Sequence, residues 1–184
     1  PQLILFISYR IMQSTFAQNL SSDTILKDTN HKSITLSESA AAGHALIDVR
    51  SSKEFQEGNI PGSICIPLFD NYEREVIGTI YKHGNREKAI SQGFQFVQDK
   101  FPDLIKHFEN YRNTPVTIYC AKGGMRSRSI VNLLSLLDIE AYQLTGGYRK
   151  YRHEVLDSLD LFNEKLIVLH GMTGTGKTRI IERL

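Results

Sequence analysis

The sequence contains no tryptophan and only two cysteines, Cys65 and Cys120, among its 184 residues. Two cysteines are too few for a disulfide framework or a four-cysteine zinc site, so we expect a reducing compartment and consider each thiol singly. An excess of charge of one sign is also missing, because 22 basic side chains are balanced by 20 acidic ones and the net charge is +2. This balance excludes a histone-like polycation, although it still allows a local basic patch.

Long apolar runs are absent as well. No segment approaches the roughly 20 apolar residues that a membrane-spanning helix needs. The longest run, Leu3–Ile7, is followed by Arg10, and no basic stretch precedes it as a signal peptide would require. We therefore expect no membrane segment and a cytoplasmic protein. Because the sequence begins at Pro1, we also expect Met12 to be the natural start.

The rest of the composition is that of a globular protein, with 41% hydrophobic and 23% charged residues. Short apolar runs alternate with segments of helical spacing, which predicts an α/β fold with a mainly parallel sheet. The expected strands are Ser33–Leu36, Ala45–Val49, Ser63–Pro67, Pro115–Tyr119 and Ala141–Leu144. We expect a flexible lead-in over residues 1–32, a first domain over 33–159, a linker over 160–164 and the start of a second domain over 165–184.

Helices are expected between these strands. A short one begins at a Ser51 or Ser52 cap and ends at Gly58, and another runs from about Tyr148 to Leu159. Between residues 85 and 111 a helix is interrupted by Pro102. Its apolar positions are Ile90, Phe94, Val97 and Phe101, followed by Leu104, Ile105 and Phe108. A further helix presents an inner face of Ile130, Leu133, Leu134 and Leu137. Residues 70–75 are only a charged stretch in this interpretation.

Cys120 stands at the carboxyl end of a predicted buried strand and is followed by a glycine-bearing loop and a helix. The backbone N–H groups of such a loop converge on one point, and the helix dipole adds positive potential there. Both effects favour a thiolate over a thiol, so we predict that Cys120 is a nucleophile. Gly123 and Gly124 are expected to adopt positive φ, and Lys122 and Arg126 to add positive charge. The predicted anion-binding loop consists of Ala121, Lys122, Gly123, Gly124, Met125, Arg126 and Ser127.

Two chemistries suit this loop. In sulfur transfer the thiolate holds a sulfane sulfur as a persulfide, whereas in a Cys-x5-Arg phosphatase Cys120 and Arg126 would cradle a tetrahedral oxyanion. A phosphatase also needs a carboxylic acid to protonate its leaving group, and no candidate is evident in the loop. The spacing alone leaves both chemistries open.

Several short stretches resemble the rhodanese family. Ile47–Ser51, Glu54-Phe55 and Gly58–Gly62 are similar to its N-terminal signature, and Leu144–Tyr148 to its closing strand and turn. The resemblance implies a rhodanese-like parallel sheet flanked by helices. It also implies that Asp48, Arg50 and the Gly58–Gly62 turn are structural, as buried polar ties between loop and strand.

Four longer stretches resemble one subfamily, the rhodanese half of the tRNA 2-selenouridine synthases. They are Pro67–Glu75, Val76–Lys82, Tyr119–Ser127 and Gly146–Arg152. The resemblance implies that sulfur in a wobble 2-thiouridine of tRNA is replaced by selenium from selenophosphate, through an S-geranylated intermediate. In this subfamily Cys120 would handle the chalcogen, and Lys122, Arg126 and the loop amides would bind the selenophosphate.

The implied partners are therefore tRNA and an enzyme that supplies selenophosphate. The chain departs from the subfamily just after the cysteine, where Ala121-Lys122 replaces the usual Trp-Arg. This change retains one cation and removes an aromatic surface. A generic rhodanese sulfurtransferase remains the alternative.

A second motif, G-x-x-x-x-G-K-[ST], spans residues 171–178 and follows an apolar strand expected at Leu166–Leu169. This is the context of a phosphate-binding P-loop, in which backbone amides wrap a phosphate and lysine reaches its outer oxygens. The candidate residues are Gly171, Gly174, Thr175, Gly176, Lys177 and Thr178. Thr178 would ligate Mg²⁺ if a metal is used.

The P-loop motif alone suggests an ATP or GTP hydrolase. Its position after a rhodanese-like domain is that of the selenouridine synthases, and the resemblance implies that geranyl diphosphate is bound there. A non-catalytic, nucleotide-binding adaptor is a further alternative. The six histidines show no metal-ligand spacing, and Cys65 is interpreted as a core residue. Basic residues that would suit tRNA phosphates are Arg126, Arg128, Arg149, Lys150 and Arg152.

Overall fold

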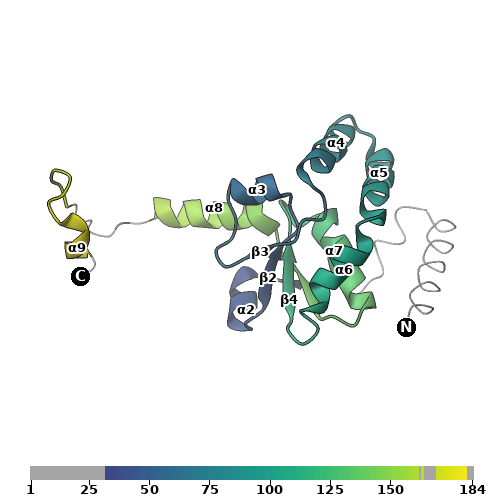
Figure 1. Cartoon of the computed structure of the whole chain (residues 1–184), viewed down its shortest axis with the longest axis horizontal. Helices are drawn as coiled ribbons and strands as arrows, with labels where there is room; N and C mark the ends of the chain where they lie inside the picture. The colour runs from purple at the N-terminus through teal and green to yellow at the C-terminus, as the bar shows by residue number, and fades with distance from the viewer. Residues whose placement is uncertain (1–31, 162, 164–168, 182–184) are drawn as a thin grey trace. The chain divides into compact units, whose positions relative to one another are not determined.

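The computed structural model of the chain describes residues 32–161, 163 and 169–181. Within this part of the chain, parallel strands form one sheet in the order β1-β5-β4-β2-β3 (Figure 1). The strands are β1 (Ser33–Ile34), β2 (Ala45–Asp48), β3 (Ile64–Cys65), β4 (Val116–Tyr119) and β5 (Ala141–Leu144). The predicted α/β fold with a parallel sheet is confirmed.

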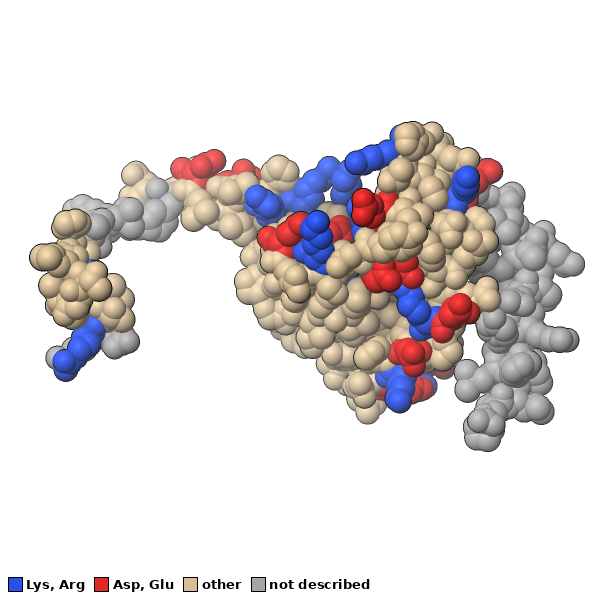
Figure 2. All heavy atoms as spheres, turned by 45° about the horizontal axis from the view of Figure 1, so that its top comes forward, with Lys and Arg blue, Asp and Glu red and all other residues tan. Residues whose placement is uncertain are grey.

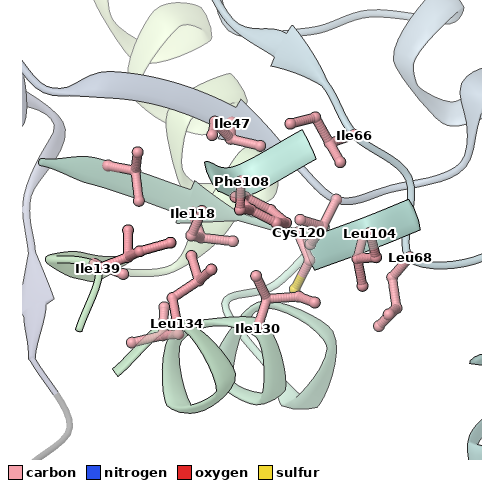
Figure 3. Close-up of a cluster of buried hydrophobic side chains, with 14 of the residues drawn as sticks. Ile47, Ile66, Leu68, Leu104, Phe108, Ile118, Cys120, Ile130, Leu134 and Ile139 are labelled. Atoms are coloured by element: carbon pink, nitrogen blue, oxygen red, sulfur yellow. The ribbon is translucent and has the colours of Figure 1, made fainter. Parts of the chain in front are cut away.

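Helices cover both faces of this sheet (Figure 1). They are α2 (Leu36–Ala41), α3 (Ser52–Gln56), α4 (Asn71–Lys82), α5 (Arg86–Gln98), α6 (Phe101–Glu109), α7 (Met125–Leu136) and α8 (Gly147–Asp160). On one face, Leu104 and Phe108 of α6 and Ile130 and Leu134 of α7 pack in the main core, where Cys120 also lies (Figure 3). On the other face a smaller cluster consists of Ile60, Tyr119 and Leu144, with Leu36, Leu46, Tyr148 and Tyr151 packed against it.

Three helices begin with the same local device, a capping box. The N-cap side chain accepts a hydrogen bond from the N3 backbone, and the N3 glutamate accepts one from the N-cap backbone. The pairs are Thr35 with Glu38 in α2, Ser51 with Glu54 in α3, and Asp70 with Glu73 in α4. The predicted cap at Ser51 is confirmed. The charged stretch at residues 70–75, in contrast, is the first turn of a helix, which we had not predicted.

Two details of the predicted elements are wrong. The strand expected at Ser33–Leu36 ends at Ile34, because Thr35 caps α2. In α5 the buried residues are Ala89 and Gly93, whereas Phe94, one of the apolar positions that define the predicted helix, is 53% exposed. The reason is close packing: a Cβ built on Gly93 would lie 3.3 Å from Cζ of Phe69, just before α4, and 3.7 Å from Cδ1 of Ile77 in α4, so a small residue has to face them.

The chain divides into two compact units, one that ends at Arg152 and one that begins at His153. The division falls within α8, and the domain limits predicted from the sequence stay predictions. The second unit includes α9 (Lys177–Ile181). The flexible lead-in expected over residues 1–32 lies outside the described residues except for Lys32, and the strand expected before the P-loop lies outside them except for Leu169.

Candidate active site

Cys120 is the residue that follows β4, whose four residues are all buried. The run Val116–Tyr119 forms a central strand because β-branched and aromatic side chains fill both of its faces. Cys120 is only 3% exposed, and its sulfur lies at the edge of the main core, near α7 (Figure 3). The predicted strand, cysteine, loop and helix therefore follow one another as expected.

Two groups contact the sulfur of Cys120. The backbone N–H of Gly124 donates to Sγ over 3.3 Å, and the hydroxyl of Ser127 lies 3.2 Å from Sγ. Burial acts to raise the pKa of the thiol. The Ser127 hydroxyl, the charge of Arg126 and the backbone N–H groups of Ser127 and Lys122 outweigh burial and lower the pKa of Cys120 below its ordinary value. The geometry thus favours a thiolate in a small cradle of donors.

Arg126 contributes its charge to this cradle, but its guanidinium is bound to a carboxylate. Its Nη1 donates to Glu54 Oε2 over 2.7 Å and its Nη2 to Glu54 Oε1 over 3.2 Å. Arg74 lies 3.4 Å from the same carboxylate. Burial acts to raise the pKa of Glu54, yet these arginines and the backbone of Ser51 hold it below its ordinary value. Arg126 therefore faces Glu54 of α3 in this structure, and sequence reasoning missed this ion pair.

The loop glycines differ from each other. Gly123 has φ +63, and a Cβ there would lie 3.1 Å from the backbone of Leu144 and of Gly146, so the prediction for Gly123 is confirmed. Gly124 has φ −100, so the positive φ expected there is wrong. Among the other loop residues Lys122 is exposed, Ala121, Met125 and Arg126 are half-buried, and Ser127 is buried. Lys122 is thus the loop cation that solvent reaches most easily.

The first turn of α8 holds the loop in place. The backbone N–H of Tyr148 donates to the carbonyl of Cys120 over 2.9 Å, and that of Arg149 to the carbonyl of Ala121 over 2.9 Å. Gly147 has φ +60, and a Cβ there would lie 2.3 Å from the carbonyl oxygen of Cys120. Gly147 at the start of α8 therefore forms part of the site. The stretch Gly146–Arg152 was used in the sequence only for the family resemblance, and its contact with the cysteine loop was missed.

Asp48 and Arg50 tie the end of β2 to the Gly58–Gly62 turn. Arg50 donates to both carboxylate oxygens of Asp48 and, through Nη2, to the carbonyl of Gly58 over 2.7 Å. The Cζ atom of Arg50 also lies 4.0 Å from the ring centre of Tyr148, a cation–π contact. These contacts agree with the structural role inferred for Asp48 and Arg50.

Cys65 lies on β3, and its surroundings are unlike those of Cys120. Burial and the charge of Asp48 raise the pKa of its thiol, although Arg50 opposes them. A raised pKa disfavours the thiolate at neutral pH. Cys65 is half-buried and belongs to neither core cluster, so its interpretation as a core residue is not confirmed.

In the second unit, the described residues 169–181 include the whole P-loop motif. Gly174 and Gly176 have φ +86 and +78. The ammonium of Lys177 donates to the carbonyls of Gly171 and Met172, each over 2.7 Å, so it lies against the loop that it follows. Thr178 is exposed in the first turn of α9. Phosphate binding by this motif stays a prediction.

The described residues contain no group of three or more histidine, cysteine, aspartate or glutamate side chains that could hold a metal ion. None of their helices is long and apolar enough to cross a membrane. Figure 2 shows lysine and arginine side chains interspersed with aspartate and glutamate on the visible face. The basic surface expected for tRNA stays a prediction.

Comparison with known proteins gives the following relatives. The family model described as Rhodanese-like domain matches residues 34–154. The tRNA 2-selenouridine synthase of Nitrosomonas europaea is 35% identical over 74% of this chain and 37% of its own length. The one from Nitrosomonas eutropha is 34% identical over 86% of this chain and 42% of its own length. The chain thus spans about two fifths of the length of these curated relatives.

A solved structure also matches. It is the N-terminal domain of a protein from Clostridium difficile 630 that is described, provisionally, as ATP/GTP binding. That domain is 42% identical, with a TM-score of 0.64, and the match covers 68% of this chain and 99% of the domain. The resemblance to tRNA 2-selenouridine synthases inferred from four sequence stretches is therefore confirmed by similarity over most of the chain.

Proposed function

Because the chain belongs to the rhodanese-like domain family, we propose that it supplies the rhodanese part of a tRNA 2-selenouridine synthase. In this function sulfur of a wobble 2-thiouridine in tRNA is replaced by selenium from selenophosphate, through an S-geranylated intermediate. The enzyme is then a selenium- and sulfur-transferring transferase that works in the cytoplasm beside an enzyme that makes selenophosphate. The observation that carries the proposal is the buried thiol of Cys120 in a cradle of donors that lowers its pKa.

Cys120 handles the chalcogen in this proposal. A thiolate is the form of cysteine that attacks or holds sulfur and selenium, and the cradle favours it. The exposed Lys122 and the loop N–H groups supply positive charge and donors for the oxygens of selenophosphate. The Arg126 guanidinium supports the thiolate through its charge while Glu54 binds it.

The position of Arg126 also bears on the phosphatase alternative. In a Cys-x5-Arg phosphatase the arginine side chain would wrap the oxyanion held over the cysteine. Here both ends of that guanidinium donate to Glu54, at 2.7 and 3.2 Å, which favours chalcogen transfer over phosphate-ester hydrolysis. Thiosulfate:cyanide and phosphatase assays on the purified chain distinguish both alternatives from selenation.

The P-loop is assigned to geranyl diphosphate in this proposal. Lys177 and the amides of residues 174–178 would bind the diphosphate, and Thr178, which is exposed at the start of α9, would ligate a Mg²⁺ ion. Phosphate oxygens of the bound diphosphate would also be ligands of that ion. The nucleotide alternative is retained, because the relative from Clostridium difficile is described in terms of ATP/GTP binding.

The function is tested in cells with and without the full-length gene that encodes this chain. Mass spectrometry of digested tRNA should show 2-selenouridine at the wobble position only when the gene is present. Geranylated thiouridine should accumulate when selenium is withheld. A cell that makes the same amount of selenouridine without the gene contradicts the proposal.

A further inference from the structure

Gln143 is a buried polar residue that belongs to neither the loop nor the motifs found in the sequence. It lies on β5, is 4% exposed, and has Ile118 of β4 as its partner in the sheet. Cys120 follows two residues after Ile118, and side chains two apart in a strand direction point to the same face. Gln143 thus reaches the underside of the cysteine loop, and a buried amide requires hydrogen-bond partners there.

The amide nitrogen of Gln143 has two partners. Its Nε2 donates to Ser127 Oγ over 2.6 Å and to the carbonyl of Gly124 over 3.0 Å. A carbonyl oxygen only accepts, so the NH₂ end of the side chain must face Gly124. Both N–H groups of Gln143 are therefore used, one on each acceptor.

These bonds determine where the hydroxyl proton of Ser127 goes. That proton has two acceptors within reach, the carbonyl of Gly124 at 3.2 Å and Cys120 Sγ at 3.2 Å. The Gly124 carbonyl already accepts from Gln143 and from the backbone N–H of Arg128 at 3.2 Å. A carbonyl oxygen has two lone pairs, and both are occupied. The sulfur is the acceptor that remains for Ser127.

We propose that Gln143 is a positioning residue that directs the Ser127 hydroxyl toward Cys120 and so stabilises the reactive thiolate. The inference rests on the proposed role of Cys120 as a nucleophile and extends it to the neighbouring strand. Gln143 does not touch the sulfur in this arrangement. It acts through Ser127 and through the Gly124 carbonyl that it occupies.

Other groups that act on the thiolate would not change with Gln143. Arg126 of α7 is the charge that lowers the pKa of Cys120. Glu54 of α3 binds Arg126, and Arg74 of α4 lies close to Glu54. The remaining donors are backbone N–H groups of the loop, including that of Gly124. An effect of Gln143 therefore has to appear through the Ser127 hydroxyl.

The test is the pH dependence of alkylation of Cys120 by iodoacetamide, followed for the Cys120 peptide by mass spectrometry. In Gln143→Met, which retains the length of the side chain without its donors, the midpoint should rise by about half to one pH unit. Ser127→Ala should raise it by a similar amount. In the double variant the midpoint should rise little further, because both changes interrupt the same hydrogen-bonded path from Gln143 through Ser127 to the sulfur.

Tyr142→Phe is the matched control. It removes a hydrogen-bonding group from the neighbouring position of β5, where the hydroxyl contacts the exposed Glu140, and it should leave the midpoint unchanged. If Gln143→Met fails to fold, Gln143→Asn serves instead, since its amide is one methylene too short for both acceptors. Thermal unfolding shows whether each variant is folded, and only folded variants are compared with the unchanged chain.

The outcomes separate the two proposals. A low midpoint in the unchanged chain with no shift in Gln143→Met overturns the role of Gln143 alone, as do fully additive shifts in the double variant. A midpoint at the ordinary thiol value in the unchanged chain contradicts the thiolate itself, and with it the proposed function.

Discussion

Glu54 binds both ends of the Arg126 guanidinium, at 2.7 and 3.2 Å, and so joins α3 to the first turn of α7 across 72 residues of sequence. Both side chains are mostly buried, with 22% and 17% exposure. Arg126 thus places a positive charge near Cys120, and the carboxylate of Glu54 neutralises part of that charge. The thiolate at this site therefore depends on a balance between Arg126 and Glu54.

Removing the charge of Glu54 tests this balance. Glu54→Gln should lower the alkylation midpoint of Cys120 further, because Arg126 then acts on the thiolate without a counter-charge. The same change should reduce the free energy of unfolding by about 1–3 kcal/mol, since a largely buried charged hydrogen bond becomes neutral. Glutamine still completes the capping box with Ser51. Glu38→Gln in the matching box of α2 is the control and should not move the midpoint. An unchanged midpoint in Glu54→Gln contradicts the coupling.

Cys120→Ser should abolish formation of selenouridine while the fold persists. Serine preserves the volume of the side chain but forms neither a persulfide nor a selenosulfide. Cys65→Ser is the matched control, because the pKa of Cys65 is raised and its thiol is expected to take no part. Both variants are compared with the unchanged gene by mass spectrometry of wobble uridines. Normal selenouridine in Cys120→Ser would falsify the role assigned to Cys120.

The lowered pKa of Cys120 also predicts how stability depends on pH. A group whose pKa is lower in the folded state stabilises the fold above its unfolded pKa, which is about 8.5 for a thiol. That stabilisation is lost as the pH falls through the folded pKa. The unfolding free energy of the unchanged chain, relative to Cys120→Ser, should therefore increase from neutral pH to about pH 9 and then level off. A difference that decreases with rising pH overturns the assignment of a thiolate.

Gly147→Ala should disrupt the site because there is no room for its Cβ. The new atom would lie 2.3 Å from the carbonyl oxygen of Cys120, at a residue with φ +60. Gly43→Ala is the control, since its φ of +68 carries the same backbone strain and nothing lies within 4 Å of the new atom. We expect a loss of about 1–2 kcal/mol for Gly43→Ala and a further 1–3 kcal/mol for Gly147→Ala in chemical denaturation. Only Gly147→Ala should raise the alkylation midpoint of Cys120. An equal loss of unfolding free energy in the two variants would contradict the close packing at Gly147.

Lys177→Ala tests the P-loop in a full-length protein that contains this chain. If the motif binds geranyl diphosphate, geranylation of thiouridine should stop, whereas selenation of a supplied geranylated tRNA should continue. Lysine stabilises a diphosphate only while that leaving group is present. Arg179→Ala, at the first residue after the motif, is the control. Joint loss of both steps, with nucleotide hydrolysis stimulated by tRNA, supports the nucleotide alternative and overturns the geranyl assignment.

The fold was predictable from the sequence where its signals are local. Ala45–Asp48 and Val116–Tyr119 are short apolar runs bounded by turn residues, and they form strands as expected. Ser51 caps α3 within a box of four residues. The start of α4 carries the same signal in Asp70 and Glu73, so that helix was available to sequence reasoning and was missed. Phe94 was misplaced because the inner face of α5 depends on how closely α4 approaches it.

The sequence by itself determined that a cysteine would follow a buried strand and precede a glycine loop and a helix, because each of those features is encoded within a few adjacent residues. Only the tertiary structure decided what surrounds that cysteine. Gln143 meets Ser127 because β5 pairs with β4 in one particular register, and Arg126 meets Glu54 because the fold brings the first turn of α7 close to α3, 72 residues away in sequence. Such contacts depend on sheet order and register, which arise from burial of the whole core and leave no local pattern to recognise.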